Sequence, residues 1–411
     1  MNEKLLWKQI RNAYMNVPLY SNLLKPEEYM EIEAEGDLTK LPVINKSQMV
    51  DNESACLTAS AYMDYMQGKL IRERTSGSSG QYLEIIWNRT DFKKSLIELW
   101  MRRAKYYDVY PHNRLLFFFT SGTDNCEIIE RKYEFGINKD KLTLSGLDEV
   151  YDKILWWNPE WMLLQPSTAV ILCEYIKMNK CEIPPELKYI EFSGELLTDE
   201  VREMTKTIFN CNVANQYGAN EVNSIAYECP YGNMHVMKSN VYVEIADEYD
   251  NAIKDECEGR VLLTSLTNSV MPFIRYDIGD RARLYRNKNC SCGCSGTIIE
   301  LETGRKNDYI RLSDKRRIGS YLLVKVFNRV NLYSEGAVKQ FYVEQTDFDK
   351  FEVKLFIDDE IDESYISQLF LQEISDTELS GAEFTFLYTD KYINNLNNNK
   401  YVYFRSCFRL G

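Results

Sequence analysis

The chain has 411 residues, 45 % of them hydrophobic and 13 % aromatic, so it can bury a large core and is expected to form two or three domains. Its net charge of −13 argues against nucleic acid or an anionic membrane as the main partner, although local arginines and backbone dipoles can still hold a nucleotide. Eleven cysteines, mostly single and in apolar surroundings, predict reduced thiols, and the lack of a signal peptide or a long apolar run predicts a cytoplasmic protein.

Apolar residues at helical spacing predict helices within residues 1–35 and over 91–103. Strands then alternate with helices, which predicts an α/β domain with a largely parallel sheet, over 115–119, 147–155, 161–165, 168–178, 189–192 and 199–209. Residues 241–284 are strand-rich and predict a β subdomain. Past about residue 306, one helix and several strands predict a small α+β domain, with elements over 341–344, 351–356, 362–374 and 384–387.

A Ser/Gly-rich stretch between two β-type segments is the first candidate binding element. It consists of Thr75, Ser76, Gly77, Ser78, Ser79 and Gly80. Its glycines permit backbone angles closed to other residues, and its hydroxyl and N–H groups can surround a phosphate. It is not a Walker A loop, which needs Gly-Lys-Ser/Thr at the start of a helix. A flexible turn is the alternative interpretation.

The second candidate is the triplet Ser193, Gly194 and Glu195, which follows the predicted strand 189–192. Ligands of open α/β sheets bind at this end of the strands, so the triplet is placed to contact one. The alternative is an ordinary strand–helix turn with a solvated carboxylate.

The third candidate is the segment 216–221, which contains Gln216, Tyr217, Gly218 and Glu221. The tyrosine ring can stack on a base, and the glycine lets the backbone come close to a ligand. The glutamate can ligate Mg²⁺, which prefers carboxylate oxygen and shares the phosphates of a substrate. The alternative is a glycine turn with a surface carboxylate.

Two later segments supply further polar groups. Residues 272–280 end in Asp280, whose carboxylate can accept both hydroxyls of a ribose. Residues 304–308 contain Arg305 and lie where the composition of the chain changes.

The segments 75–80, 193–195, 217–221, 275–280 and 304–308 come in the order and approximate spacing of the adenylate-forming superfamily. The sequence resembles its phenylacetate–coenzyme A ligase branch over nearly the whole chain. The resemblance implies a large ATP- and carboxylate-binding domain over residues 1–305, with a β subdomain at about 236–305, and a small mobile domain over 306–411.

The resemblance also implies two half-reactions. A carboxylate attacks the α-phosphate of ATP, giving acyl-AMP and pyrophosphate, and a thiol then takes the acyl group as a thioester. Thr75–Gly80 would hold the β,γ-phosphates and Glu221 would hold Mg²⁺. Tyr217 would stack on adenine, Asp280 would bind the ribose, and Arg305 would bind ribose or phosphate.

Lys400 matches by location the family lysine that reaches the α-phosphate and the carboxylate in the first step. Three departures from the family accompany it. The preceding glycine is absent, Asn220 replaces a threonine, and Gln81 and Tyr82 stand where lysine and proline are common. These departures bear on the rate rather than on the class of reaction.

The expected cofactors are therefore ATP and Mg²⁺ with coenzyme A as the acceptor, or else the phosphopantetheine of a separate acyl or peptidyl carrier protein. The expected substrate is a small carboxylic acid, and the aromatic run 117–119 favours an aromatic one. A non-catalytic nucleotide-binding protein of the same fold and a zinc-stabilised interaction module are the alternative classes.

A dense thiol cluster predicts a structural zinc site as well. Cys290, Cys292 and Cys294 lie close together, and Cys229 and His235 precede them by about sixty residues. The favoured ligands are Cys229, His235, Cys290 and Cys292, with Cys294 as a competitor for the last place. Plain reduced thiols are the alternative.

Overall fold

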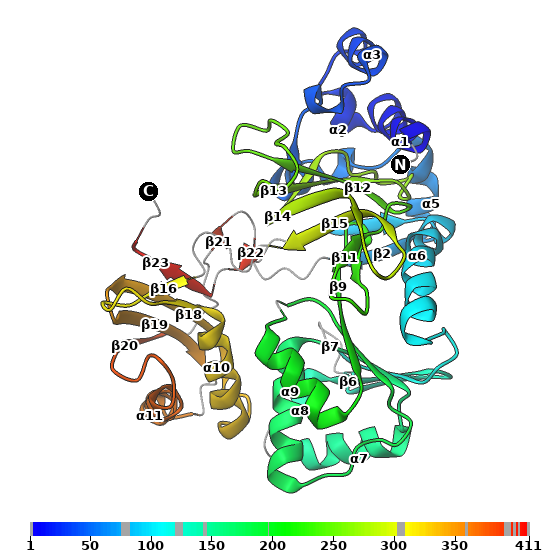
Figure 1. The fold of residues 1–411 in the computed structure, drawn as a ribbon. Helices are drawn as coiled ribbons and strands as arrows, with labels where there is room; N and C mark the ends of the chain where they lie inside the picture. The colour runs from blue at the N-terminus through cyan, green and yellow to red at the C-terminus, as the bar shows by residue number, and fades with distance from the viewer. Residues whose placement is uncertain are drawn as a thin grey trace. The chain divides into compact units, whose positions relative to one another are not determined.

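The computed structural model describes residues 3–74, 83–119, 126–142, 146–195, 197–301, 309–357, 361–389, 396–397, 400–401 and 403–408 (Figure 1). The chain divides into two compact units. Unit 1 consists of Met1–Asp108, Ala214–Glu302 and Leu396–Tyr401. Unit 2 consists of Val109–Val213, Thr303–Asn395 and Val402–Gly411.

The N-terminal part of unit 1 is helical, as predicted for residues 1–35. Its helices are α1 (Glu3–Asn16), α2 (Pro18–Ser21), α3 (Pro26–Glu35), α4 (Lys46–Asp51), α5 (Tyr62–Met66) and α6 (Arg89–Tyr107), with 3-10 turns η1 (Leu38–Lys40), η2 (Glu53–Ala55) and η3 (Ala59–Ala61). Local capping sets the start of α6, because the side chain of Asn88 accepts from the Asp91 N–H at 2.8 Å. The hairpin of β2 (Ile71–Arg74) and β3 (Glu84–Trp87) is antiparallel.

The main sheet of unit 1 is antiparallel apart from one short strand. Its order is β12-β13-β14-β15-β11-β10-β9, and β1 (Ile44–Asn45) pairs in parallel with β14. The strands are β9 (Asn212–Ala219), β10 (Asn223–Glu228), β11 (Met234–Val236), β12 (Val241–Ala246), β13 (Gly259–Ser265), β14 (Tyr276–Asn289) and β15 (Ser295–Leu301). Buried apolar residues of this sheet and of the N-terminal helices form one core.

The first part of unit 2 is the predicted α/β layer. Its strands have the order β8-β7-β4-β6-β5, and all neighbours are parallel except β5 and β6. The strands are β4 (Leu115–Phe119), β5 (Ile128–Arg131), β6 (Glu134–Asn138), β7 (Trp161–Leu164) and β8 (Tyr189–Phe192). They share a core with α7 (Leu147–Trp157), α8 (Pro166–Asn179) and α9 (Asp199–Phe209).

The C-terminal part of unit 2 has a core of its own. A four-stranded sheet of order β20-β19-β18-β23 packs with α10 (Tyr321–Tyr333) and α11 (Glu363–Ser375). The strands are β18 (Val338–Asp347), β19 (Lys350–Ile357), β20 (Glu383–Thr389) and β23 (Phe404–Ser406), and β16 (Tyr309–Arg311) pairs with β17 (Arg317–Gly319).

The predicted fold class is therefore confirmed: an α/β chain with a β-rich part and a smaller α+β part. Two features were not predicted. Residues 128–138 form an antiparallel hairpin at the edge of the parallel sheet, and residues 216–219 belong to strand β9 instead of a turn. Among the described helices, none is both long enough and apolar enough to cross a membrane.

Candidate active site and metal centre

Two tyrosine–carboxylate pairs in unit 1 connect the motif segments 216–221 and 272–280. The hydroxyl of Tyr217, on β9, donates to Asp280 Oδ2 at 2.9 Å. The hydroxyl of Tyr276, at the start of β14, donates to Glu221 Oε1 at 3.0 Å. These hydrogen bonds join residues some sixty positions apart in the chain, from β9 and the turn after it to β14, two strands of one sheet.

Both phenols in these pairs are donors at neutral pH. Burial raises the pKa of Tyr217 well above 10, and the Asp280 charge raises it further. Burial and the Glu221 charge do the same for the pKa of Tyr276. Glu221 is 7 % exposed and Tyr276 is 1 % exposed, so the alternative of a surface carboxylate at Glu221 is wrong. No role was predicted for Tyr276, although it lies inside the segment 272–280.

Gly218 lies in the β9–β10 hairpin where no side chain fits. A Cβ atom there would stand 2.4 Å from the carbonyl oxygen of Asn223 and 2.7 Å from Gln216 Nε2. Gln216 Nε2 in turn donates to Ser224 Oγ at 3.3 Å. Both contacts lie within the hairpin itself, and the approach of the Gly218 backbone to a ligand stays a prediction.

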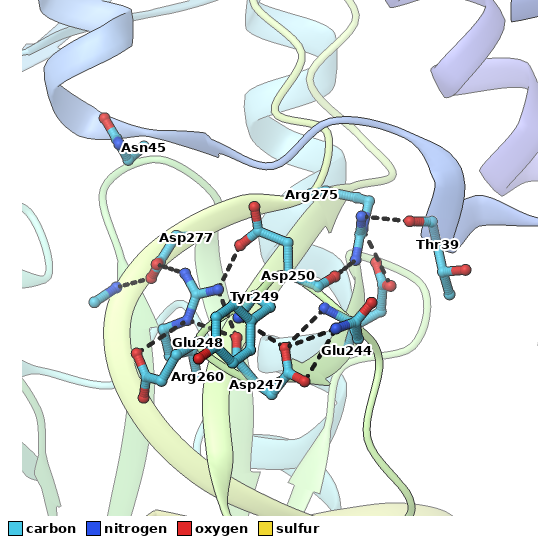
Figure 2. A network of polar contacts seen from close by, with 12 residues as sticks. Thr39, Asn45, Glu244, Asp247, Glu248, Tyr249, Asp250, Arg260, Arg275 and Asp277 are labelled. Carbon is cyan, nitrogen blue, oxygen red and sulfur yellow. Dashed lines mark hydrogen bonds and ion pairs between the residues drawn. The ribbon is translucent and has the colours of Figure 1, made fainter.

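A buried arginine fixes the start of β14, which carries Tyr276 and Asp280 (Figure 2). Arg275 is 1 % exposed and donates to the carbonyl oxygens of Thr39 at 2.9 Å, Leu41 at 2.5 Å and Asp250 at 3.0 Å. Its Nε lies 3.3 Å from Glu244 Oε1. Burial raises the pKa of Glu244, and the Arg275 charge opposes this rise.

The triplet Ser193, Gly194 and Glu195 follows β8 in unit 2. Gly194 has a φ of 87°, a left-handed conformation that favours glycine. Glu195 accepts from the Ser167 N–H at 2.9 Å and from Ser167 Oγ at 2.8 Å. The carboxylate therefore caps the first turn of α8 and is not simply solvated.

Lys139, in the 3-10 turn η4 (Lys139–Lys141), is a charged residue near this triplet that the sequence analysis missed. Burial lowers the pKa of Lys139, and the charge of Glu195 partly offsets that change. Its only sequence signal is a lysine directly after a strand of the parallel sheet.

Three other predictions stay without a structural description of their side chains. Thr75–Gly80 and Arg305 lie outside the described residues. For Lys400 only the backbone is described, in the two-residue strand β22 (Lys400–Tyr401) opposite β21 (Leu396–Asn397).

The four favoured zinc ligands lie together in unit 1. One ligand atom from each of Cys229, His235, Cys290 and Cys292 falls within 4.8 Å of the others. The Sγ atoms of Cys229 and Cys290 are 3.7 Å apart, and Cys292 Sγ lies 3.3 Å from His235 Nε2. A tetrahedron with Zn–S bonds of about 2.3 Å has S–S edges of about 3.8 Å, so the geometry fits a closed zinc site.

The histidine of this cluster is neutral at physiological pH. Burial lowers the pKa of His235 to about 4, and the charges of Arg102 and Lys105 contribute to the shift. Neutral imidazole is the form that binds metal. Four protein ligands would leave no open position, which suits a structural rather than a catalytic metal.

No protein-family model matches the chain. It is 22 % identical over 366 residues to protein CapK of Staphylococcus aureus, covering 87 % of this chain and 77 % of that protein. It is 24 % identical over 329 residues to phenylacetate-coenzyme A ligase of Pseudomonas putida (75 % and 70 % covered), and 22 % identical over 332 residues to the Escherichia coli enzyme (75 % and 71 % covered).

Solved structures of 2-hydroxyisobutyryl-CoA ligase have the same fold. One in the postadenylation state gives a TM-score of 0.65 at 13 % identity and covers 98 % of this chain and 88 % of that one. Another, in the thioesterification state, gives 0.61 at 14 % identity and covers 98 % and 89 %.

The chain thus has the fold of the 2-hydroxyisobutyryl-CoA ligase structures and is similar in sequence to phenylacetate-coenzyme A ligases. The resemblance inferred from the motifs is confirmed, and the chain is a distant relative of the phenylacetate–coenzyme A ligases.

Proposed function

We propose that the protein activates a carboxylic acid with ATP and passes the acyl group to coenzyme A. In the first step a carboxylate oxygen attacks the α-phosphorus, and pyrophosphate leaves. In the second step the thiol sulfur attacks the acyl carbonyl, and AMP leaves. The protein is an AMP-forming acid–thiol ligase.

The observation that supports this function best is the pairing of Tyr217 with Asp280 and of Tyr276 with Glu221. It brings the adenine, ribose and magnesium residues of the resemblance into one part of unit 1. Tyr217 offers a ring to a base and Asp280 offers oxygens to a ribose, while Glu221 would hold Mg²⁺, whose charge offsets that of the phosphates. Adenylyl transfer is mostly positioning and charge neutralisation, which these groups can provide.

The remaining roles follow the resemblance. Thr75–Gly80 would hold the β,γ-phosphates, and Lys400 would reach the α-phosphate and the carboxylate in the first step. Ser193, Gly194, Glu195, Gln216, Gly218 and Arg305 complete the proposed nucleotide site. We assign residues 1–305 to the adenylation domain and 306–411 to the smaller mobile domain, in support of which the sheet β20-β19-β18-β23 has its own core.

The substrate class we propose is an aromatic carboxylic acid. Relatives named phenylacetate-coenzyme A ligase support an arylacetic acid as the first choice. The metal content proposed is Mg²⁺ with the nucleotide and one structural Zn²⁺ on the Cys/His cluster. We place the protein in the cytoplasm because none of its eleven cysteines, all of which the structure describes, forms a disulfide.

The test is acid-dependent ATP–pyrophosphate exchange across a panel of carboxylic acids that begins with arylacetic acids. The wild-type chain should catalyse exchange with at least one acid, and Glu221→Ala and Asp280→Ala should abolish it. Glu258→Ala, which removes a surface carboxylate paired with Arg281, is the matched control and should leave exchange unchanged. No exchange with any acid would instead favour a non-catalytic nucleotide-binding protein.

The acceptor is tested separately. Coenzyme A and a purified holo-carrier protein are each incubated with ATP, the acid and the enzyme, and thioester formation is followed. Transfer to the carrier alone would replace coenzyme A with a separate carrier chain as the partner.

A further inference from the structure

The Cys/His cluster has a second layer of contacts on helix α6. Tyr106 Oη lies 3.6 Å from Cys292 Sγ, and Arg102 Nη1 lies 3.6 Å from Cys294 Sγ. The same Arg102 nitrogen lies 3.4 Å from Tyr106 Oη, so the two side chains form one unit against the sulfurs. Nothing in the cysteine spacing points to these residues.

We propose that Arg102 and Tyr106 form the outer shell of the zinc site and make Cys292, not Cys294, its fourth ligand. In this arrangement Cys294 stays outside the ligand set as the sulfur partner of Arg102. The proposal concerns the metal site alone and is independent of the adenylating activity.

Hydrogen bonds distinguish the two competing thiols. Cys292 Sγ accepts a hydrogen bond from the Tyr106 hydroxyl and another from the Cys294 N–H, the latter at 3.4 Å. It is 3.3 Å from His235 Nε2, whereas Cys294 Sγ is not among the clustered ligand atoms. Donors to a ligating sulfur fix its orientation, and Asn233 Nδ2 does the same for Cys290 Sγ at 3.3 Å.

Charge explains why an arginine lies here. Three thiolates and a neutral imidazole around Zn²⁺ leave a net charge of −1. Arg102 is 8 % exposed and also pairs with Glu98 at 2.7 Å, so its cation lies between that carboxylate and Cys294 Sγ at the edge of the cluster. Glu98 is itself held by the N–H of Ser239 at 3.0 Å. A buried cation beside a partly buried anionic cluster lowers the penalty of burying either group.

The choice of ligand is tested by removing each thiol. Wild type, Cys292→Ala and Cys294→Ala are purified as full chains, and zinc per chain is measured by elemental analysis. Cobalt substitution then reports the number of thiolate ligands through the sulfur-to-metal charge-transfer band. Cys294→Ala should keep one zinc and the wild-type band, and Cys292→Ala should lose zinc or one thiolate. The reverse result, equal behaviour of the two variants, or a wild type without zinc would overturn the proposal.

The outer shell is tested by zinc affinity against a chromophoric chelator. Tyr106→Phe should weaken zinc binding by about 10- to 100-fold, the usual effect of losing an outer-shell partner. Because Arg102→Met alone strands the Glu98 charge, the double variant Glu98→Gln with Arg102→Met is used and should weaken binding by a similar factor. Urea unfolding of the zinc-loaded variants separates lost affinity from lost folding.

Tyr65→Phe is the matched control, because that hydroxyl donates to Glu84 at 3.0 Å and to no sulfur. It should leave zinc affinity unchanged. Wild-type affinity in both Tyr106→Phe and the double variant would show that α6 only packs beside the metal site, and the proposal would fall.

Discussion

The buried bond between Tyr276 and Glu221 predicts a large effect for the loss of one oxygen atom. Tyr276→Phe removes the hydroxyl from a residue that is 1 % exposed, and it leaves Glu221 Oε1, in a residue that is 7 % exposed, without that donor. A hydrogen bond to a charged group contributes about 1.5–3 kcal/mol to stability, and most of that contribution is lost when the buried donor is removed. The free energy of unfolding should fall by about 1.5–3 kcal/mol, and the carboxylate should lose its fixed orientation.

Urea unfolding of wild type and variant measures the first effect, with the m-value expected to be unchanged. Tyr107→Phe is the comparison, because that hydroxyl donates to the neutral carbonyl of Glu228 at 3.2 Å and should be worth only about 0.5–1.5 kcal/mol. Tyr276→Phe should in addition raise the Mg²⁺ concentration for half-maximal exchange, and Tyr107→Phe should not. Equal stability losses in the two variants would refute the reasoning about a charged acceptor.

Three further predictions are independent of this pair. Lys400→Ala should lower acid-dependent pyrophosphate exchange by about 10²–10³-fold but thioester formation from preformed acyl-AMP far less, and equal losses would contradict its assignment. Glu195→Ala should lower the free energy of unfolding by about 0.5–2 kcal/mol because the cap of α8 is lost, whereas Glu195→Gln keeps an acceptor and should lose less in the same urea titration. Burial raises the pKa of Glu73 above 4.5, so the folded chain binds the carboxyl proton of Glu73 more tightly than the unfolded chain does. The stability that this protonated carboxyl contributes is therefore lost as the pH rises through the raised pKa. Glu73→Gln should therefore flatten the pH dependence of urea unfolding just above pH 4.5, and an unchanged slope would show that Glu73 is solvated in the folded chain.

The periodic elements were predictable because their pattern is local. Apolar spacing found α6, α8 and α9 to within a few residues, and short apolar runs found β4, β7 and β8. The hairpin of β5 and β6 was missed, since its charged residues do not alternate with apolar ones. Tyr217 and Asp280 meet although their strands, β9 and β14, are not neighbours in the sheet, and no local signal encodes that meeting.

In the candidate sites, too, some residues could be found from local sequence motifs and others could not. Glycine, carboxylate and cysteine motifs name the residues that touch a ligand, because those residues carry the chemistry. The residues that hold them in place belong to ordinary elements and have no motif. Tyr276 and Arg275 were visible in the segment 272–280, but only the structure shows that one donates to Glu221 and the other ties β14 to Thr39 and Leu41.

Helix α6 nevertheless carried a signal that periodicity can detect. Its residues 91, 95, 98, 102 and 106 are polar and lie three or four positions apart, so they share one face. Asp91, Ser95 and Arg102 on that face are buried, while the apolar Ile97 and Met101 are 54 % and 65 % exposed. Buried polar side chains need hydrogen-bond partners, so a helix that buries a polar stripe requires polar groups opposite that stripe in the fold. Ser95 finds one in Asn223 at 2.7 Å and Asp91 another in the N–H of Ser269 at 3.0 Å. At the end of the stripe, the buried Arg102 pairs with Glu98 at 2.7 Å and also lies 3.6 Å from Cys294 Sγ, and the partly buried Tyr106 lies 3.6 Å from Cys292 Sγ. The polar stripe of α6 therefore ends at the sulfur cluster, which is why its last two residues are the ones we propose as the outer shell.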